Sequence, residues 1–268
     1  MAQSLQGQRV LVTGSGSGIG RLLAMGAADR GAKVVLWDLS GDSAADVQAE
    51  IALRGGHAEA CAVDVSDREA VRHAAQQTGP VDVLINNAGV ITGETLVDAS
   101  DDEIERTFKV NTLALFWVTR AFLDTMIENR RGTVVTIASA AGLVGVAKQT
   151  DYSASKFAAF GFAESLRMEM AKGQTGVVSL VVCPYFVSTG MFDGVRTKYP
   201  RLLPILTPEY VAERTLVAIE EGRHQLIMPR FAKLVSPARV LPVSWFDRLV
   251  NQLGINDTMD HFIGRSRR

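Results

Sequence analysis

The chain lacks the features of membrane-spanning, secreted and metal-binding proteins. Its apolar runs fall short of the roughly 18 residues that a membrane-spanning helix needs. The polar start from Met1 to Arg9 resembles neither a signal peptide nor a membrane anchor. The two cysteines, Cys61 and Cys183, lie in apolar runs typical of buried reduced thiols, and neither has the Cys-x-x-Cys or Cys/His spacing of a metal site. We therefore expect a cytoplasmic protein without a metal.

An excess of charge of either sign is also missing. The 28 basic residues nearly balance the 29 acidic ones, which leaves a net charge of -1 and a pI of about 6.4. No nucleic-acid partner is expected for such a chain. With 47% hydrophobic and 21% charged residues, the 268 residues suffice for one large α/β domain with a well-buried sheet.

Strand and helix signals alternate from the N-terminus to about residue 228. Short apolar runs predict strands over Val10–Thr13, Lys33–Asp38, Ala58–Asp64, Val81–Asn86, Thr133–Ala138, Val177–Cys183 and Leu226–Met228. Amphipathic stretches predict helices over Gly18–Arg30, Ser43–Arg54, Asp67–Gln77, Asp101–Asn129 (capped by Ser100) and Tyr152–Lys172. We expect one domain over residues 1–228, a doubly wound parallel sheet of the Rossmann type with helices on both faces.

A glycine-rich turn follows the first predicted strand and opens the first predicted helix. It contains Gly14, Ser17, Gly18, Ile19 and Gly20. In such a turn the first glycine permits a tight bend, the second lets a pyrophosphate approach the main chain, and the third lets the helix lie close to the strand. The free N–H groups at the helix start then face the negative charge. The turn predicts a dinucleotide site.

Two acidic residues end the second and third predicted strands. Asp38 can accept hydrogen bonds from the ribose hydroxyls of adenosine and would repel a 2′-phosphate, which predicts NAD(H) rather than NADP(H). Asp64, with Val65 and the adjoining main chain, could contact the adenine edge. Alternatively, Asp64 only caps the helix that begins near Asp67.

Four further residues carry candidate chemistry. Tyr152 and Lys156 lie at positions i and i+4 of a predicted helix and so share one face. A fixed ammonium lowers the pKa of a neighbouring phenol, so the pair could act as a general acid/base. Ser139 follows the fifth predicted strand and could hydrogen-bond a substrate oxygen. Asn111, inside a long helix, either holds a water that relays protons from Lys156 or is a satisfied structural amide.

Two C-terminal segments break the alternating pattern. Residues 190–208 combine apolar residues with three prolines just past a strand end, which predicts a mobile substrate lid. Residues 229–268 form an apolar, basic extension, with seven basic against three acidic side chains. Such an extension can pack over the substrate pocket or against another subunit, or lie on a membrane surface.

In combination these residues resemble the short-chain dehydrogenase/reductase family over nearly the whole chain. The resemblance rests on Thr13-Gly14-x-x-x-Gly18-x-Gly20, Asn86-Asn87-Ala88-Gly89, Asn111, Ser139 and Tyr152-x-x-x-Lys156, in the order expected for the family. It implies that Tyr152 is the acid/base, that Ser139 and Lys156 assist it and that Asn111 holds the relay water. It also implies that Asn87, Ala88 and Gly89 lie against the cofactor.

A narrower resemblance points to the branch of epidermal-type retinol dehydrogenases and 17-beta-hydroxysteroid dehydrogenases. It is carried by Trp37-Asp38, Ser139-Ala140-Ala141-Gly142, Lys156-Phe157-Ala158-Ala159 and the segment from Cys183 to Phe192. In that segment Pro184, Val187 and Thr189 would contact the cofactor, Val187 and Thr189 at the nicotinamide carboxamide. The chain departs from the family where the usual Pro-Gly is replaced by Pro184-Tyr185.

The resemblance implies an NAD(H)-dependent oxidoreductase that interconverts a hydrophobic secondary or allylic alcohol and its ketone or aldehyde. A non-catalytic scaffold that senses the cofactor is the alternative. A third possibility is the same enzyme as a peripheral membrane protein that acts on lipid-like substrates. A homodimer or homotetramer is expected, with an interface on the two long helices around Asn111 and Tyr152.

Overall fold

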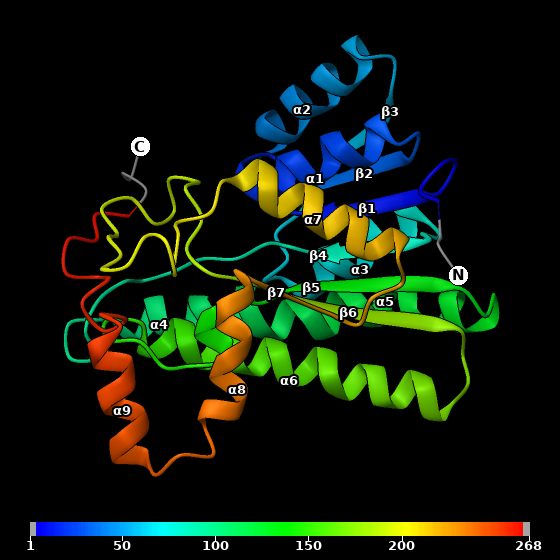
Figure 1. Cartoon of the computed structure of the whole chain (residues 1–268). Helices are drawn as coiled ribbons and strands as arrows, with labels where there is room; N and C mark the ends of the chain where they lie inside the picture. The colour runs from blue at the N-terminus through cyan, green and yellow to red at the C-terminus, as the bar shows by residue number, and fades with distance from the viewer. Residues whose placement is uncertain (1–3, 265–268) are drawn as a thin grey trace.

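The computed structural model describes residues 4–264 and contains a central sheet of parallel strands (Figure 1). The sheet has seven strands in the order β3-β2-β1-β4-β5-β6-β7. Their bounds are β1 Arg9–Thr13, β2 Lys33–Asp38, β3 His57–Ala62, β4 Val83–Asn86, β5 Gly132–Ile137, β6 Val177–Pro184 and β7 Gln225–Met228. The predicted strands are all present, with ends shifted by one or two residues.

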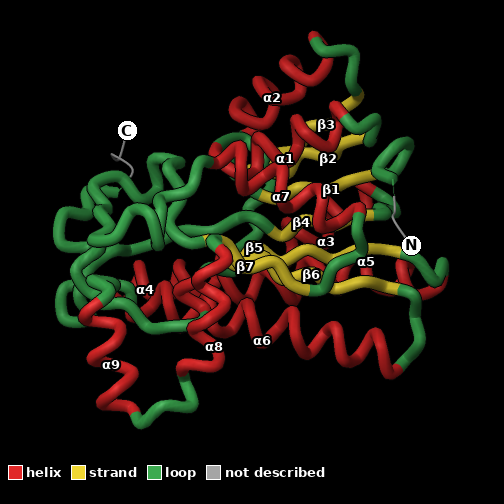
Figure 2. Tube along the Cα trace, viewed as in Figure 1, coloured by secondary structure: helices red, strands yellow, loops and turns green. Residues whose placement is uncertain are grey.

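Helices cover both faces of the sheet (Figure 2). One face carries α1 (Gly18–Asp29), α2 (Gly41–Leu53) and α7 (Pro208–Glu220), whose apolar side chains pack on Val10, Val12 and Val34 in one core cluster. The other carries α3 (Arg68–Thr78), α5 (Ala114–Glu128) and α6 (Thr150–Lys172), which pack on Leu11, Val35 and Leu84. The doubly wound fold predicted from the sequence is therefore confirmed.

The strand order places a crevice where the chain reverses direction across the sheet. β1 pairs with β2 on one side and with β4 on the other, so the connections that leave β1 and β4 cross to opposite faces. Ligands of open α/β sheets bind at the carboxyl ends of the strands at such a point. The glycine-rich turn after β1 and the loop after β4 meet there.

The long helix predicted over 101–129 is continuous but not uniform. α4 (Asp101–Phe108) begins with a capping box, in which the Ser100 side chain accepts from Glu103 N and the Glu103 side chain accepts from Ser100 N. A π-helical turn over Lys109–Leu113 then joins α4 to α5. Asn111 is at the centre of this turn, and π turns inside α-helices occur frequently at functional sites.

The sequence analysis missed α7 (Pro208–Glu220). Its start carries the usual signals, because the Thr207 side chain accepts from Tyr210 N and Pro208 occupies the first turn. Reading residues 190–208 as one loop hid these signals. The helix packs on α1 and completes that layer of the fold.

The C-terminal segment lies beside the carboxyl ends of the strands, next to the loop 190–207 (left side of Figure 1). It runs from residue 230 to residue 264 and contains a 3-10 helix (Arg230–Leu234), α8 (Val235–Ala238) and α9 (Val243–Gln252). Its inner side chains, among them Val250, Ile255 and Met259, join Leu203 and Phe192 of the loop in one apolar cluster.

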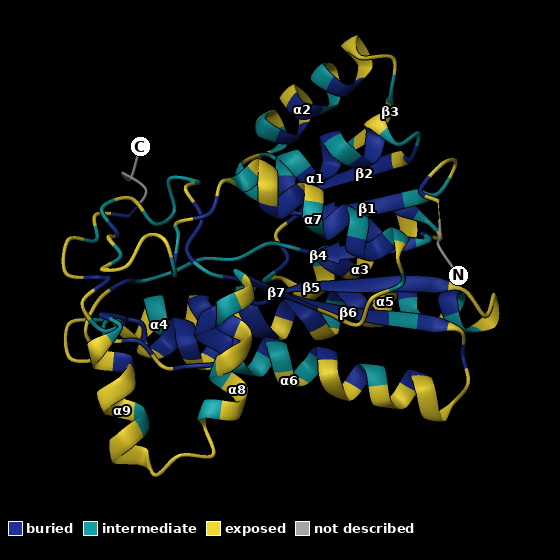
Figure 3. Ribbon diagram, in the orientation of Figure 1, coloured by how far each residue is buried: buried dark blue, intermediate teal, exposed yellow. Residues whose placement is uncertain are grey.

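The outer side of this segment is exposed, as Figure 3 shows for α9 and the loop that precedes it. Val240 is 88% exposed, Val243 76% and Trp245 63%. Among residues 4–264, no helix combines the length and the apolar character required to cross a membrane.

Candidate functional site

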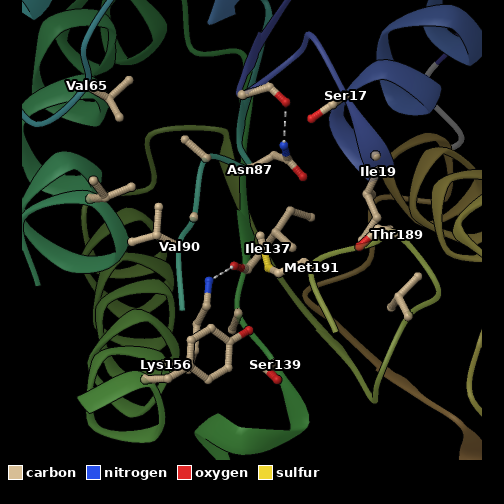
Figure 4. A pocket seen from close by; sticks show the side chains of 18 of the residues that line it. Ser17, Ile19, Val65, Asn87, Val90, Ile137, Ser139, Lys156, Thr189 and Met191 are labelled. Carbon is tan, nitrogen blue, oxygen red and sulfur yellow. Dashed lines mark hydrogen bonds between the residues drawn. The ribbon is translucent and has the colours of Figure 1, made fainter. Parts of the chain in front are cut away.

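One continuous groove runs along the carboxyl ends of the strands (Figure 4). Most of the residues predicted for the site line it, namely Gly14, Ser17, Gly18, Ile19, Asp38, Asp64, Val65, Asn87, Ala88, Gly89, Ser139, Tyr152, Lys156, Pro184, Val187 and Thr189. Two predicted residues, Gly20 and Asn111, lie behind its wall. The topology thus brings together residues that are as far apart in the chain as Gly14 and Thr189.

The glycine-rich turn has no room for side chains at its two ends. Gly14 has φ +65°, and a Cβ there would lie 2.9 Å from Ala88 Cα. A Cβ on Gly20 would lie 2.0 Å from the carbonyl oxygen of Gly14. Gly20 therefore permits the close contact between α1 and the turn, as predicted, and acts from behind the groove.

The loop after β4 holds the glycine-rich turn in place through hydrogen bonds. Asn87 Nδ2 donates to the carbonyl oxygens of Thr13 (2.9 Å) and Gly14 (3.1 Å). In return, Thr13 Oγ1 accepts from the backbone N–H groups of Asn87 and Ala88. The motif Asn87-Ala88-Gly89 is thus a brace for the turn as well as part of the groove wall.

The two predicted acidic residues both face the groove. Asp38 Oδ2 accepts from Gly16 N at 2.8 Å and Oδ1 accepts from Ser40 N at 2.9 Å. Each carboxylate oxygen keeps a second lone pair for a ligand hydroxyl. Asp64 accepts from the backbone and hydroxyl of Ser66. It does not cap α3, because Asp67 fills that position.

Ser139, Tyr152 and Lys156 converge at the inner end of the groove. Tyr152 and Lys156 are one turn apart on α6, and Lys156 Nζ lies 5.7 Å from the centroid of the Tyr152 ring. Lys156 Nζ donates to the carbonyl oxygen of Ile137 at 3.0 Å, the dashed line beside Lys156 in Figure 4. Ser139, two residues past Ile137, lines the groove beside Tyr152, and its hydroxyl lowers the pKa of the Tyr152 phenol.

Burial controls the protonation of this cluster. Tyr152 is 5% exposed, and burial raises its pKa to about 12, although the Ser139 hydroxyl lowers it. Burial lowers the pKa of Lys156 to about 8, against a raising effect of the nearby Cys183 thiol. Desolvation of the phenol sets the direction of this shift, and the acidifying effect of Lys156 on Tyr152 stays a prediction for the cofactor-bound protein.

Asn111 is a satisfied amide that ties three segments together. Its Oδ1 accepts from Val90 N at 2.8 Å, and its Nδ2 donates to Val90 O at 2.9 Å and to Ser155 Oγ at 3.0 Å. Ser155 Oγ in turn donates to the carbonyl oxygen of Tyr152. Of the two interpretations of Asn111, these contacts favour the structural one: the residue positions the start of α6 and the loop after β4.

A second, mostly apolar cavity adjoins the groove at Tyr152. Ser139, Tyr152, Tyr185 and Phe192 line both spaces. The Phe192 ring packs edge-on against Tyr152, with 5.9 Å between centroids, and against Phe186 at 5.2 Å. One part of the remaining wall comes from the stretch between β5 and α6, for example Val144 and Val146, and another from the loop 190–207 and the C-terminal segment, for example Leu203, Val235 and Ile255. The loop thus covers the cavity, and Phe192 stands between cavity and groove.

The segment after β6 reaches across the groove to the glycine-rich turn. Val187 is 3% exposed and forms a parallel bridge with Leu206. A Cβ on Gly18 would lie 3.5 Å from Thr189 Cβ, so the two backbones approach closely at this point. Pro184 ends β6, and the Tyr185 that replaces the family's glycine lies in the wall of both spaces.

Sequence reasoning did not identify several lining residues. Val90 and Ile137 line the groove because they neighbour the ends of β4 and β5, which strand boundaries alone could have indicated. Gln149, 1% exposed in the wall of the apolar cavity, carried no such signal, since an isolated glutamine before a helix belongs to no motif.

Comparisons with known proteins agree with this geometry. Residues 8–200 match the family model described as short chain dehydrogenase. The mouse protein named Epidermal retinol dehydrogenase 2 is 43% identical over 276 residues, which cover 99% of this chain and 88% of the mouse protein. The rat protein named Estradiol 17-beta-dehydrogenase 11 is 39% identical over 259 residues, or 94% of this chain and 86% of the rat protein.

Solved structures of similar proteins contain either nicotinamide cofactor. A short chain dehydrogenase/reductase from Burkholderia phymatum in complex with NAD aligns with a TM-score of 0.80 at 26% identity, covering 89% of this chain and 95% of that chain. A metagenomic short-chain oxidoreductase in complex with NADP aligns with a TM-score of 0.70 at 30% identity, covering 84% of this chain and 97% of that chain.

Proposed function

Because this chain belongs to the short-chain dehydrogenase family, we propose that it is an NAD(H)-dependent oxidoreductase that interconverts a hydrophobic secondary or allylic alcohol and its ketone or aldehyde. The observation that carries the proposal is the position of Tyr152. Its ring lies at the junction between a groove that suits a dinucleotide and a cavity that suits an apolar molecule. Ser139 lies beside it in the wall of both spaces, and Lys156 lies one turn away.

The shape and the lining residues of the groove suit a dinucleotide. Gly14 has no room for a Cβ and lines the groove with main chain alone, and Gly20 behind it lets α1 lie close to the turn. The start of α1 at Gly18 then points its N–H groups toward the place of a pyrophosphate. Asp38 would hold the ribose hydroxyls, and its charge would repel a 2′-phosphate. Among the described residues, the basic side chains that line the groove are Arg106 and Lys156, which come from α4 and α6 rather than from the Asp38 region.

The cluster around Tyr152 supports proton transfer to or from a substrate oxygen. In reduction, a protonated phenol gives its proton to the oxygen as hydride arrives at carbon; in oxidation, the phenolate takes it back. The nicotinamide supplies or accepts the hydride, and its oxidised ring adds a positive charge that favours phenolate. Lys156, whose pKa burial lowers to about 8, contributes an ammonium at neutral pH, and Ser139 donates to the oxygen as negative charge develops there.

A substrate panel with both cofactors tests the proposal. Steroids, retinoids, aryl ketones and short alcohols are incubated with NAD(H) or NADP(H), and the absorbance of the reduced nicotinamide is followed. We expect turnover of apolar substrates and a preference for NAD(H). A preference for NADP(H) would contradict the assignment of Asp38. Cofactor binding without turnover of any substrate would instead support a non-catalytic scaffold that senses the cofactor.

A paired variant tests the cofactor preference directly. Asp38→Ser with Leu39→Arg removes the carboxylate and adds a cation beside the same place, so we expect the preference to shift toward NADP(H). Asp46→Ser is the matched control, because this exposed carboxylate on α2 does not line the groove. The assignment fails if the preference of the paired variant equals that of the control.

We also propose that the exposed side of residues 233–249 rests on anionic membranes. Val240, Leu241, Val243 and Trp245 project there, and the flanking Lys233, Arg239 and Arg248 supply charge complementary to anionic lipid. The inner side of the same segment lines the apolar cavity. The membrane contact is favoured because exposed apolar side chains and basic side chains occur together on a segment whose inner side lines the apolar cavity.

Vesicle binding tests this surface. We expect cosedimentation with vesicles that contain phosphatidylserine, a blue shift of Trp245 emission, and weaker binding at high salt. Val240→Asp with Val243→Asp abolishes binding, whereas Leu53→Asp with Val97→Asp, at equally exposed positions elsewhere, leaves it intact. Equal losses in both variants, or no binding by the unmodified chain, would exclude the membrane contact.

For the assembly, we propose a homodimer or homotetramer through α5 and α6. Phe116 on α5 and Met168 on α6 expose apolar side chains there, as does Leu113 at the end of the π turn before α5, and the Phe116 ring packs edge-on against Phe162. Light scattering after size exclusion measures the mass of the particle. Phe116→Glu should shift it toward the monomer, and an unchanged mass would place the interface elsewhere.

A further inference from the structure

Two buried polar atoms in the wall of the apolar cavity beside Tyr152 have no hydrogen-bond partner among residues 4–264, namely Gln149 Nε2 and Tyr185 Oη. The Thr197 hydroxyl lies near Tyr185 Oη and influences its pKa, whereas Gln149 has no such neighbour among the described residues. Gln149 lines this cavity but not the groove, and it is 1% exposed. The surrounding wall is mostly hydrocarbon, from residues such as Val144, Val146 and Leu203.

The fold itself makes no use of this amide. Gln149 is the N-cap residue of α6, yet its side chain makes no capping hydrogen bond. The backbone of Gln149 does form hydrogen bonds: its N–H donates to Val146 O in the preceding loop, and its carbonyl accepts from Ser153 N in α6. A buried donor without an acceptor destabilises a fold, and a hydrocarbon side chain of the same shape would avoid that cost. The amide therefore needs an acceptor that enters the cavity.

The acceptor is not the oxygen that reacts. A ketone oxygen has two lone pairs, and in the proposed reaction the hydroxyls of Ser139 and Tyr152, which both line the cavity, donate to it. These two donors saturate it. The Gln149 amide is left to donate to another atom of the same molecule.

We propose that Gln149 binds a second oxygen of the substrate, so that the preferred substrates are apolar ketones and alcohols with an acceptor oxygen close to the reacting carbon. Gln149 and Tyr152 are three positions apart at the start of α6, where Cβ atoms are about 5–6 Å apart. The second oxygen consequently belongs near the reacting carbon rather than at the far end of the apolar body. This inference rests on the proposed function.

A matched substrate pair tests it. A long-chain 2-ketone is compared with analogues in which one of the first methylenes beyond the carbonyl is replaced by an ether oxygen, which can only accept. We expect the unmodified enzyme to prefer one ether analogue in kcat/KM. Gln149→Met keeps the shape of the side chain and removes the donor, and we expect this preference to fall roughly 3–10-fold. The intrinsic reactivity of each ketone cancels in that comparison.

Controls separate binding from structure. Leu203→Met changes the shape of the same cavity without touching a polar atom, and it should leave the preference unchanged. Gln149→Met should match or exceed the melting temperature of the unmodified chain, because it removes the unsatisfied buried donor. If Gln149→Met does not fold, Gln149→Leu replaces it. Calorimetric affinities of the ketone and its ether analogue for Tyr152→Phe, with and without Gln149→Met, give the same comparison without turnover.

The outcomes distinguish this inference from the function on which it rests. If the unmodified chain reduces no ketone, the proposed function fails. If it reduces ketones and its preference for the ether analogue is absent, or is the same in Gln149→Met, the role of Gln149 is overturned while the oxidoreductase assignment stands. A preference lost in Gln149→Met and kept in Leu203→Met supports the second-oxygen contact.

Discussion

The two sides of Tyr152 are built from different interactions. On the cofactor side, directional hydrogen bonds hold the main chain, such as those of Asn87 to Thr13 and Gly14 and that of Asp38 to Gly16. On the substrate side, the loop 190–207 and the C-terminal segment meet through apolar packing, as in the contact of Phe192 with Phe186. Hydrogen bonds have narrow geometry, whereas apolar contacts tolerate change of shape.

This difference indicates which parts of the site tolerate substitution. The nicotinamide cofactor is the same for every substrate, so a backbone turn held by hydrogen bonds can be specific for it. The apolar side can change its lining without disturbing the turn, because the two share few residues beyond Ser139, Tyr152, Tyr185 and Phe192. Variants on either side should therefore separate cofactor binding from substrate selection.

The largest effect is expected at the junction. Tyr152→Phe removes the proton donor and keeps the ring that packs on Phe192, so turnover should fall about 10²–10⁴-fold. Affinity for NAD(H), measured by fluorescence titration, should stay the same. Tyr210→Phe is the control, because that exposed tyrosine on α7 lines neither space. Turnover by Tyr152→Phe close to that of the control would remove Tyr152 from the chemistry.

The second effect concerns the buried ammonium. Burial lowers the pKa of Lys156 from 10.5 to about 8, so below pH 8 the folded protein carries a costly buried charge. Between pH 8 and 10.5 the unfolded chain binds the extra proton, and Lys156 therefore makes stability rise with pH. Lys156→Met lacks this dependence. The free energy of unfolding of Lys156→Met minus that of the unmodified chain should therefore fall by up to about 3 kcal/mol between pH 7 and pH 10.5.

Urea unfolding at several pH values measures that difference. Tyr152 and Cys183, whose pKa values burial raises to about 12, titrate in both proteins and largely cancel. Lys172→Met, at the exposed end of α6, should follow the unmodified chain at every pH. A constant gap between Lys156→Met and the unmodified chain would mean that Lys156 is not desolvated.

A third prediction concerns the turn alone. Gly20→Ala places a Cβ 2.0 Å from Gly14 O, so the helix must move away from the turn. We expect a loss of about 1–3 kcal/mol in stability together with weaker NAD(H) binding. Gly161→Ala is the matched control within α6, where a Cβ meets nothing within 4 Å, and it should gain about 0.5–1 kcal/mol. Unchanged cofactor affinity in Gly20→Ala would break the link between the turn and the ligand.

The smallest effect is expected on the substrate side. Phe192→Ala removes the ring that packs between Tyr152 and Phe186, and kcat/KM for apolar substrates should fall roughly tenfold. The dissociation constant for NAD(H) should hardly change. Tyr199→Ala removes a largely exposed aromatic from the same loop and should alter neither quantity. A parallel loss of cofactor affinity in Phe192→Ala would erase the distinction between the two sides.

The cofactor side could be predicted from the sequence because its signals are local. The glycine spacing, the acidic strand end at Asp38 and the pair Tyr152 and Lys156 each act within one turn or helix, and the family resemblance drawn from them is confirmed. The order of alternating strands and helices likewise predicted the sheet, because a parallel strand needs a crossover.

The rest depends on contacts between distant segments. The raised pKa of Tyr152 results from burial by several elements, which a spacing of four residues does not describe. The orphan amide of Gln149 exists because Leu203 and Ile255 close the cavity from remote parts of the chain. The missed α7 is different: Thr207 and Pro208 marked its start, and the apolar, proline-rich loop before it obscured the signal.

The π turn over Lys109–Leu113 sets the rotation of α4 relative to α5 about the axis of the long helix. One residue advances an α-helix by about 100°. Deleting a residue there to restore a regular helix would rotate α4 against α5 by that angle and carry Asn111 away from Val90 and Ser155. The extra residue of the π turn thus lets α4 and α5 each present its own face to the rest of the fold. Removing one residue would shorten the helix only slightly, but α4 and α5 could then no longer both keep their contacts.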